Sequence, residues 1–399
     1  MRILMISDVY FPRINGVSTS TQIFRDELIQ RGHKVTLIAP QYPNCEAADD
    51  IIRIPSRQVL FDPEDRMMKS KDVMALLPML RNENYDLLHI QTPFVAHHLG
   101  IKLAKALNIP CIETYHTFFE EYLFHYIPFV PKTWMRALAR HFTRKQCNAV
   151  DSVIVPSTAM SEILENYGVT TGMKIIPTGM ELNKFHHCNG ARFRQHYQIP
   201  ASRPSLVHIG RVAHEKNIDF LLRMLKQLRS SIPDILLIIA GEGPALSHLR
   251  KQTAKLDLSD NVLFVGYLSR ADALLDCYCA GDAFVFASRT ETQGLVLLEA
   301  MALGVPVVST AVMGTKDILQ PQRGALVAQE DPVKFAETVH YLLENEFLRK
   351  RLSKEARDYV KEWSAPMMAE RLLEYYQQLV HARKEKQQTQ QIASAASSN

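Results

Sequence analysis

Residues 282–310 read DAFVFASRTETQGLVLLEAMALGVPVVST. The segment begins with an apolar run, DAFVFAS, that has the length of a buried strand, and RTETQG follows it as a polar loop with a glycine. LVLLEAMALG then has the length and composition of a buried helix closed by Gly304, and VPVVST has the composition of a second strand. This order predicts a strand–helix–strand unit, the building block of a parallel sheet.

The same alternation extends through most of the chain. Short runs rich in β-branched residues recur between helical patterns in two series. The first series is RILMIS (2–7), KVTLIAP (34–40), YDLLHIQ (85–91), IPCIETYH (109–116) and SVIVPS (152–157), and the second is PSLVHIGR (204–211), ILLIIAGEG (235–243), VLFVGYL (262–268), AFVFAS (283–288) and VPVVST (305–310). The pattern restarts near Ser205, after a polar stretch over residues 181–203. We therefore predict an α/β protein with two doubly wound, parallel-sheet domains.

Four segments are expected along the chain. Residues 1–190 and 191–364 form two Rossmann-like domains. Residues 365–384 form a helix that returns to the N-terminal domain, and the low-complexity end, residues 385–399, is expected to be disordered. Open α/β sheets bind ligands at the carboxyl ends of their strands. We therefore expect the two domains to face a central cleft, with the chemistry at strand ends.

Composition excludes several classes of protein. The chain has 399 residues, of which 47% are hydrophobic, and a formal net charge of +4. This charge allows an anionic ligand or membrane surface but is far from the dense basic character of a nucleic-acid-binding protein. No apolar run is long enough to span a bilayer, and Asp8 interrupts the N-terminal run too early for a signal peptide. We expect a cytoplasmic protein whose six cysteines are reduced thiols.

Two glutamates bracket the helix of the opening segment. Glu291 lies at the carboxyl end of the preceding strand, and Glu299 falls one to two turns into the helix. Between them Gly294 allows close backbone approach, and the helix tip at Gly294 and Leu295 offers N–H groups to an anion. Carboxylates suit vicinal hydroxyls because each accepts two hydrogen bonds, so the segment fits a nucleotide sugar. The alternative is that Glu291 is solvated and Glu299 only favours the helix.

Two cations follow the first strand of the second domain, in HIGRVAHEKNIDFLL (208–222). Arg211 and Lys216 lie ahead of a helix, where they would neutralise a diphosphate and hold it as a leaving group. An exposed charged loop is the alternative for either residue alone. An exposed charged loop is a weaker explanation for two cations at the same strand end than for one.

Together these motifs resemble those of the retaining glycosyltransferases of family 4, which have the GT-B fold. The family's two glutamates, separated by seven residues, are matched by Glu291 and Glu299, and its G-R-x-x-x-E-K loop is matched by Arg211 and Lys216. The resemblance covers essentially the whole chain. It implies that the first strand-to-helix loop, DVYFPRINGVSTS, brings Gly16 close to the donor phosphate.

The resemblance implies roles for three further residues. ETYHT resembles the segment whose histidine, here His116, faces the donor hexose, although a lone histidine is more often structural. Gly266 and Tyr267 would lie beside the nucleotide base. The adjacent histidines at 97–98 and 186–187 do not predict a metal site, because neighbouring side chains diverge on a strand or helix. The family implies no catalytic metal and no cofactor besides the donor substrate.

The resemblance therefore implies a hexosyltransferase with an acceptor-binding N-terminal domain and a nucleotide-sugar-binding C-terminal domain. TQG (292–294) and TYHTFFEEYLFHYIP (114–128) resemble the branch that glycosylates diacylglycerol and related membrane lipids, although Gln293 replaces the aromatic residue of many members. We predict transfer from UDP-glucose to such a lipid on the inner face of the cell membrane. The alternatives are a GDP-mannose-dependent mannosyltransferase acting on a phospholipid or glycan, a nucleotide-sugar 2-epimerase, and a non-catalytic membrane scaffold.

The segment PKTWMRALARHFTRK, residues 131–145, predicts an amphipathic helix with two stripes about 200° apart. Aromatic residues are frequent just upstream, in 118–129, and no acidic residue lies between 132 and 145. We predict that this helix docks on an anionic membrane surface. The alternative is that its apolar stripe packs on its own sheet. The stripes are a basic one, Lys132, Arg136, Arg140 and Arg144, and an apolar one, Trp134, Leu138 and Phe142.

Overall fold

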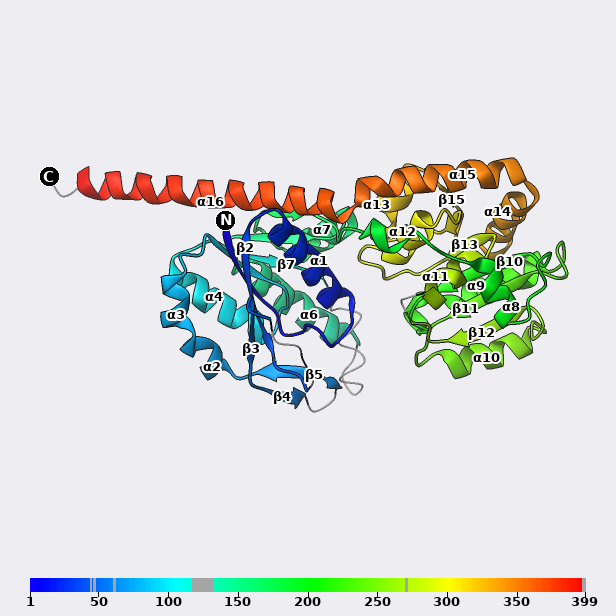
Figure 1. Ribbon diagram of the computed structural model, residues 1–399, viewed down its shortest axis with the longest axis horizontal. Helices are drawn as coiled ribbons and strands as arrows, with labels where there is room; N and C mark the ends of the chain where they lie inside the picture. Colours follow the sequence, from blue (N-terminus) through cyan, green and yellow to red (C-terminus); the bar gives the residue numbers. More distant parts are fainter. Residues whose placement is uncertain (44, 46–47, 60–61, 117–131, 270–271, 397–399) are drawn as a thin grey trace. The chain divides into compact units, whose positions relative to one another are not determined.

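A computed structural model describes residues 1–399 except 44, 46–47, 60–61, 117–131, 270–271 and 397–399 (Figure 1). The chain divides into unit 1, Met1–Gly179 with Ala365–Asn399, and unit 2, Met180–Ser364. Each unit contains a large parallel sheet with helices around it, which confirms the predicted class. The first boundary falls at residue 179 rather than 190, because Met180 bridges to Ser364 within unit 2.

The main sheet of unit 1 has the strand order β3-β2-β1-β6-β7-β8-β9, and all its pairings are parallel. Residues Ile3 to Ile6 are fully buried without alternation, as expected for a strand covered on both faces. The strands are β1 (Arg2–Ile6), β2 (Lys34–Pro40), β3 (Ile51–Ile54), β6 (Leu87–Ile90), β7 (Cys111–Thr114), β8 (Ser152–Val155) and β9 (Met173–Ile175), with β4 (Ser56–Val59) and β5 (Asp62–Met68) forming a separate antiparallel pair.

The helices of unit 1 include one from the C-terminal end of the chain. They are α1 (Gly16–Gln30), α2 (Ser70–Ala75), α3 (Leu77–Asn82), α4 (Val95–Leu107), α6 (Lys132–Cys147), α7 (Thr158–Asn166) and α16 (Ala365–Ala396). Leu372 and Tyr376 of α16 are buried in the core with β1, β2 and α1 (Figure 1). The helix continues through Ala396, into the segment from residue 385 for which disorder is predicted, and the Gln and Ala residues that are frequent there favour helices.

The sheet of unit 2 has the strand order β12-β11-β10-β13-β14-β15, again parallel throughout. Because side chains alternate along a strand, Leu236 and Ile238 enter one apolar core and Leu237 and Ile239 the other. The strands are β10 (Ser205–Ile209), β11 (Leu236–Ala240), β12 (Val262–Gly266), β13 (Ala283–Phe286), β14 (Val307–Ser309) and β15 (Ala325–Val327). The helices are η1 (Leu182–Lys184), α8 (Gly190–His196), η2 (His214–Lys216), α9 (Ile218–Leu228), α10 (Leu246–Lys255), α11 (Asp272–Ala280), α12 (Leu295–Ala302), α13 (Thr315–Leu319), α14 (Pro332–Glu344), α15 (Glu346–Tyr359) and η3 (Val360–Trp363).

The strand order reverses beside the first strand of each sheet. In unit 1 the reversal lies between β1 and β6, and in unit 2 between β10 and β13. The chain connections after these strands run toward opposite edges of the sheet, and open α/β sheets bind their ligands at such a point, outside the carboxyl ends of the strands. The loops after β10 and β13 carry the predicted cations and glutamates.

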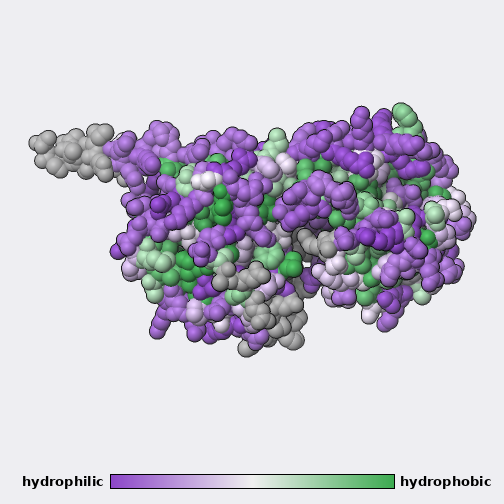
Figure 2. Space-filling view, in the orientation of Figure 1, coloured by the Kyte–Doolittle hydropathy of each residue, from purple (hydrophilic) through white to green (hydrophobic). Residues whose placement is uncertain are grey.

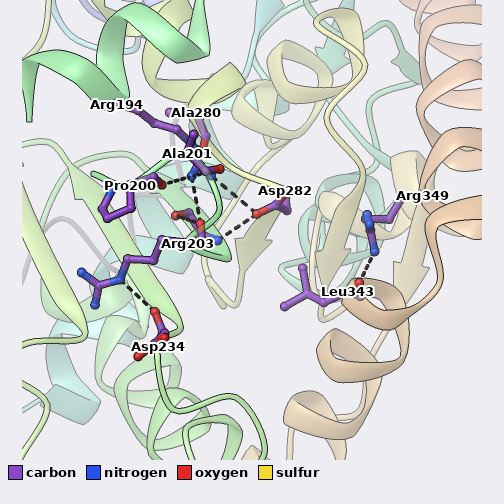
Figure 3. A network of polar contacts seen from close by, with 10 residues as sticks. Arg194, Pro200, Ala201, Arg203, Asp234, Ala280, Asp282, Leu343 and Arg349 are labelled. Atoms are coloured by element: carbon purple, nitrogen blue, oxygen red, sulfur yellow. Dashed lines mark hydrogen bonds and ion pairs between the residues drawn. The ribbon is translucent and has the colours of Figure 1, made fainter. Parts of the chain in front are cut away.

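Arg194 forms hydrogen bonds with the residues that precede β10 and β13 (Figure 3). Its Nε donates to the carbonyl of Ala280 at 2.9 Å, and its Nη1 donates to the carbonyl of Arg203, also at 2.9 Å. Asp282, just before β13, accepts a hydrogen bond from the backbone N–H of Ser205 at 2.9 Å. The two strands are therefore held together at the edge opposite the predicted site.

Cys188 and Cys279 form a disulfide, so the prediction that all six cysteines are reduced is wrong for this pair. The two residues are 91 positions apart in sequence, and α8 and α11 bring them together by packing on each other. No local pattern signals such a pairing. Cys111 and Cys277 are buried free thiols, and burial raises the pKa of each above the usual range.

The surface is mostly hydrophilic on the face shown in Figure 2, with apolar side chains scattered over both units. Among the exposed large apolar residues are Trp134 on α6 and Phe347 on α15. Within the described ranges, no helix has the length and apolar character needed to cross a membrane.

Candidate active site at the carboxyl edge of the unit 2 sheet

The loops after β10 and β13 emerge side by side. The two strands pair in parallel, with Val207 beside Phe284, so the following segments leave the same edge of the sheet. Asn217, at the end of the first loop, donates from Nδ2 to the carbonyl of Ala287 at 3.1 Å. Its φ of +56° lies in the left-handed region that asparagine tolerates better than most residues. This hydrogen bond ties the two loops together.

Lys216 and Glu291, two of the predicted residues, meet at this edge. Lys216 Nζ donates to Glu291 Oε1 at 2.6 Å, and the side chains are 21% and 18% exposed. Lys216 ends the short turn η2, whereas Glu291 lies in the loop before α12. A charge-assisted hydrogen bond at such a half-buried position holds both side chains in one orientation.

Two glycines shape the backbone around Glu291. Gly294 has φ +98° and caps the N-terminus of α12, a conformation that costs energy for other residues. The N–H of Gly314 donates to the carbonyl of Glu291 at 2.9 Å, and a Cβ on Gly314 would lie 2.0 Å from the carbonyl oxygen of Thr292. Only glycine therefore fits at residue 314, a position that the sequence analysis missed because no motif identifies it.

Glu299 lies in α12 and is 8% exposed. The hydroxyl of Tyr278, which is fully buried, donates to Glu299 Oε2 at 2.7 Å. The hydrogen bond fixes the direction of the carboxylate and stabilises its charge within the protein. Tyr278 was also missed, because it lies on α11, 21 positions earlier in the chain.

The remaining predicted residues of unit 2 are placed around the same sheet edge. Arg211 is exposed in the loop directly after β10, and Leu295 is a half-buried residue in the first turn of α12. Gly266 ends β12 with φ +73°. Tyr267 follows it and is 67% exposed. A flat, exposed aromatic ring at a strand end is suited to packing against a planar ligand group.

In unit 1, Gly16 is the first residue of α1. Asn15 caps this helix by accepting from the N–H of Ser18 at 2.8 Å, and Ser18 Oγ accepts from the N–H of Asn15 at 3.0 Å. Such reciprocal capping defines where the helix begins. Gly16 is exposed at the tip, where helix N–H groups attract anions.

His116 follows β7, and its Nε2 lies 3.1 Å from Gln91 Oε1, at the end of β6. Burial lowers the pKa of His116 to about 4, so its ring is neutral at neutral pH. Asp8, after β1, accepts from the N–H of Ala96 at 3.0 Å and from Thr92 Oγ1 at 2.8 Å. Burial raises the pKa of Asp8 to about 6. Asp8 and Gln91 were not predicted as site residues, although Gln91 directly follows β6 and Asp8 lies two residues after β1.

The adjacent histidines have other partners. His97 Nδ1 lies 2.9 Å from Glu113 Oε2, and both side chains are buried. His186 and His187 are next to each other in the segment after η1. Across the described part of the chain, no three His, Cys, Asp or Glu side chains are grouped as metal ligands would be.

Two family models match the chain, one over each unit. The model described as Glycosyltransferase Family 4 matches residues 14–184, and the model described as glycosyl transferases group 1 matches residues 190–359. The match to the group 1 model contains the Lys216–Glu291 pair and Glu299. The match to the Family 4 model contains Gly16 and His116.

The chain is similar to several characterised proteins. It is 34% identical to alpha-monoglucosyldiacylglycerol synthase of Streptococcus pneumoniae over 77% of this chain and 71% of the relative. It is 26% identical to a GDP-mannose-dependent alpha-mannosyltransferase of Mycobacterium tuberculosis over 94% of this chain and 96% of the relative. Among solved structures, HepE of Anabaena in complex with UDP has a TM-score of 0.74 at 16% identity, covering 95% of this chain and all of that one.

Proposed function

The chain belongs to the family 4 glycosyltransferases and is a hexosyltransferase, and from this premise we propose that it transfers glucose from UDP-glucose to diacylglycerol or a related membrane lipid. The Lys216–Glu291 pair at the switch point of unit 2 carries the proposal, because it sets a cation and a carboxylate together at the sheet edge where open α/β sheets bind ligands. The similarity to the monoglucosyldiacylglycerol synthases supports the choice of donor sugar and acceptor.

The proposed reaction retains the anomeric configuration and assigns each residue a task. Lys216, Arg211 and the N-terminus of α12 stabilise the negative charge that develops on the departing diphosphate. Glu291, oriented by Lys216, positions the hexose hydroxyls. Glu299, oriented by Tyr278, accepts hydrogen bonds from the ribose. An oxygen of the departing diphosphate takes the proton of the acceptor hydroxyl, so that no side-chain base is required.

Three further contacts complete the proposal. The neutral ring of His116 hydrogen-bonds to a hydroxyl of the hexose, and Gly16 admits the donor phosphate to the tip of α1. Gly266 and Tyr267 lie beside the base. These assignments follow the family resemblance, the position of Gly16 at the start of α1, and the positions of His116 and Gly266 at strand ends.

The experiment is a product assay with the full chain, labelled UDP-glucose or GDP-mannose, and detergent micelles with or without diacylglycerol. We expect α-glucosyldiacylglycerol, identified by mass spectrometry and NMR, from UDP-glucose only. Turnover should persist in excess EDTA, since we propose that no metal takes part. Mannosyl product would instead support the GDP-mannose-dependent alternative, which the mycobacterial relatives favour. A 2-epimerised sugar without lipid, or no turnover, would indicate an epimerase or a non-catalytic scaffold.

We also propose that α6 docks this enzyme on an anionic membrane surface. Met135, Ala139 and Thr143 form the buried stripe of the helix, whereas Trp134 is 76% and Leu138 57% exposed. The apolar stripe therefore does not pack on the sheet, which was the alternative interpretation. The upstream aromatic segment and the side chain of Lys132 lie outside the described residues. Exposed apolar and basic stripes on one helix are typical of a helix lying at a membrane interface.

Reversing the charge of Arg136, Arg140 and Arg144 to Glu should prevent co-sedimentation with anionic liposomes. Each basic residue near such a surface contributes about 1 kcal/mol, so losing three already weakens binding roughly a hundredfold, and the new negative charges add repulsion. The matched control reverses three exposed lysines of unit 2, Lys226, Lys251 and Lys255, with the same change in net charge. Equal losses in the two triple variants would show that net charge, and not α6, governs membrane binding.

A further inference from the structure

The Cys188–Cys279 disulfide lies beside a hollow of unit 2 that has a volume of about 360 Å³. Cys188 lines this hollow together with Leu303, which directly follows α12. Both cysteines are only half-buried. A small thiol can therefore approach the disulfide from solvent, which is the access that thiol–disulfide exchange requires.

Three other cysteines are protected from such exchange. Cys111, Cys147 and Cys277 are buried free thiols, and burial raises the pKa of each above the usual range. Buried thiols of this kind are inert. The predicted location, the inner face of the cell membrane, is a reducing environment in which disulfides are mostly transient or redox-sensing. An accessible disulfide in this setting is suited to regulation rather than to permanent cross-linking.

Two hydrogen bonds flank the disulfide along α11. The N–H of Asn189, the N-cap of α8, donates to Asp276 Oδ1 at 2.6 Å. Arg194 Nε, on α8, donates to the carbonyl of Ala280 at 2.9 Å, as Figure 3 shows. Neither hydrogen bond involves sulfur, so the two helices remain paired after reduction and only their local spacing changes.

The packing beside Cys279 is too close to accommodate reduction without movement. A Cβ on Gly190, the first residue of α8, would lie 2.0 Å from the carbonyl oxygen of Cys279. Reduction replaces the covalent S–S bond by two thiols, which must separate to van der Waals distance. Since the two backbones are already in contact, we expect the end of α11 to shift at Cys279.

The residue before Cys279 is Tyr278, whose hydroxyl donates to Glu299 Oε2 at 2.7 Å. A shift at Cys279 therefore changes the direction from which Tyr278 approaches the carboxylate. Hydrogen bonds weaken steeply as their angle departs from linearity, so the reduced protein holds Glu299 less firmly. The redox state of the disulfide and the orientation of Glu299 are thus coupled through two adjacent residues.

We propose that the Cys188–Cys279 pair is a thiol–disulfide exchange site, at which small thiols of the glutathione class control the affinity for the nucleotide sugar. The oxidised form holds Tyr278 against Glu299 and binds the donor tightly, whereas the reduced form binds it more weakly. The inference rests on the proposed function, in which Glu299 is assigned to the ribose of the donor.

The exchange proceeds in two steps. A thiolate attacks Cys188 Sγ and the S–S bond breaks, so that Cys279 leaves as a thiolate and Cys188 carries a mixed disulfide. A second thiolate attacks the outer sulfur of the mixed disulfide, and Cys188 leaves as a thiolate. The two small thiols supply two electrons and two protons and become their own disulfide, and the protons end on the two cysteines.

The experiment measures the Kd of UDP and of GDP for the full chain by calorimetry, in the oxidised form and after incubation with reduced glutathione. Alkylation followed by mass spectrometry shows whether the pair is reduced. We expect glutathione to reduce the pair and to raise the Kd of the nucleotide that binds about fivefold, the scale of one weakened hydrogen bond. Tyr278→Phe lacks the hydroxyl, so its Kd should be the same in both forms.

Two cysteine variants serve as controls. Cys188→Ser cannot form the disulfide and should have the Kd of the reduced wild type under both conditions. Cys45→Ser removes a half-buried cysteine of unit 1 outside the pair, and it should keep the fivefold change. Circular dichroism shows that the variants fold. A disulfide with a merely structural role would lower the melting temperature on reduction and leave Kd unchanged.

Equal Kd values for the two forms of the wild type would overturn the inference. A redox change that persists in Tyr278→Phe, or a disulfide that glutathione leaves intact, would overturn it as well. Tighter binding of GDP than of UDP would instead contradict the proposed donor, and the ratio between the two redox forms would then be measured with GDP.

Discussion

Replacing Lys216 by alanine is expected to lower kcat roughly a hundredfold to a thousandfold, or by about 3–4 kcal/mol, the scale of losing one preorganised electrostatic partner of a transition state. The variant loses the cation proposed to face the leaving diphosphate, and Glu291 loses the 2.6 Å hydrogen bond that orients it. Arg211→Ala should lower kcat on the same scale. The measurement is steady-state turnover of the nucleotide sugar with lipid acceptor.

The control for this prediction is Lys226→Ala, which removes an exposed lysine of the same unit on α9. It should retain wild-type kcat, and all variants should retain their melting temperature, because Lys216 and Arg211 lie in surface loops. Wild-type turnover in the double variant Arg211→Ala/Lys216→Ala at saturating donor would contradict the assignment to the leaving group.

Glu291→Ala and Glu299→Ala are expected to separate catalysis from binding. Glu291→Ala should lower kcat about a hundredfold with little change in KM, since a misplaced reacting group loses on that scale. Glu299→Ala should raise the KM of the donor about tenfold or more at nearly unchanged kcat, because its hydrogen bonds to the ribose are present in the ground and transition states alike. Steady-state kinetics over a range of UDP-glucose concentrations measure both constants.

Tyr278→Phe is the matched control for Glu299. It removes only the hydroxyl that donates to Glu299 Oε2, so it should raise KM in the same direction but less than Glu299→Ala does. If Glu299→Ala lowers kcat and leaves KM unchanged, or if Glu291→Ala has wild-type constants, the assigned roles of the two glutamates are wrong.

Local patterns in the sequence determined the fold class. Apolar runs of strand length alternate with helical periodicity, and the restart near Ser205 separates two doubly wound sheets, as the structure confirms. The same patterns placed Glu291, Arg211 and Lys216 at strand ends. Because strand and helix periodicity depends on residues that are neighbours in sequence, a single sequence is sufficient for these conclusions.

Contacts between distant segments required the tertiary structure. The ion pair of Lys216 and Glu291 joins residues 75 positions apart, and the Cys188–Cys279 disulfide joins residues 91 apart. Gly314 is required only because the carbonyl of Thr292 approaches it. Such contacts depend on how packed helices and strands bring side chains together, and the number of residues between two positions in the sequence does not encode their distance in space.

In helix α6, too, the sequence determined one part of the structure and contacts with distant residues decided the other. Its sequence determined that a basic and an apolar stripe run along it, and hydrophobicity alone would bury the apolar stripe of Trp134 and Leu138. The structure instead buries Met135, Ala139 and Thr143. Small side chains such as Ala139 allow a helix to lie close to its sheet, and Thr143 Oγ1 lies 3.4 Å from the hydroxyl of Tyr115, just after β7. Shape and hydrogen bonding against the neighbouring strand, which only the tertiary structure supplies, decided which face of α6 remains exposed.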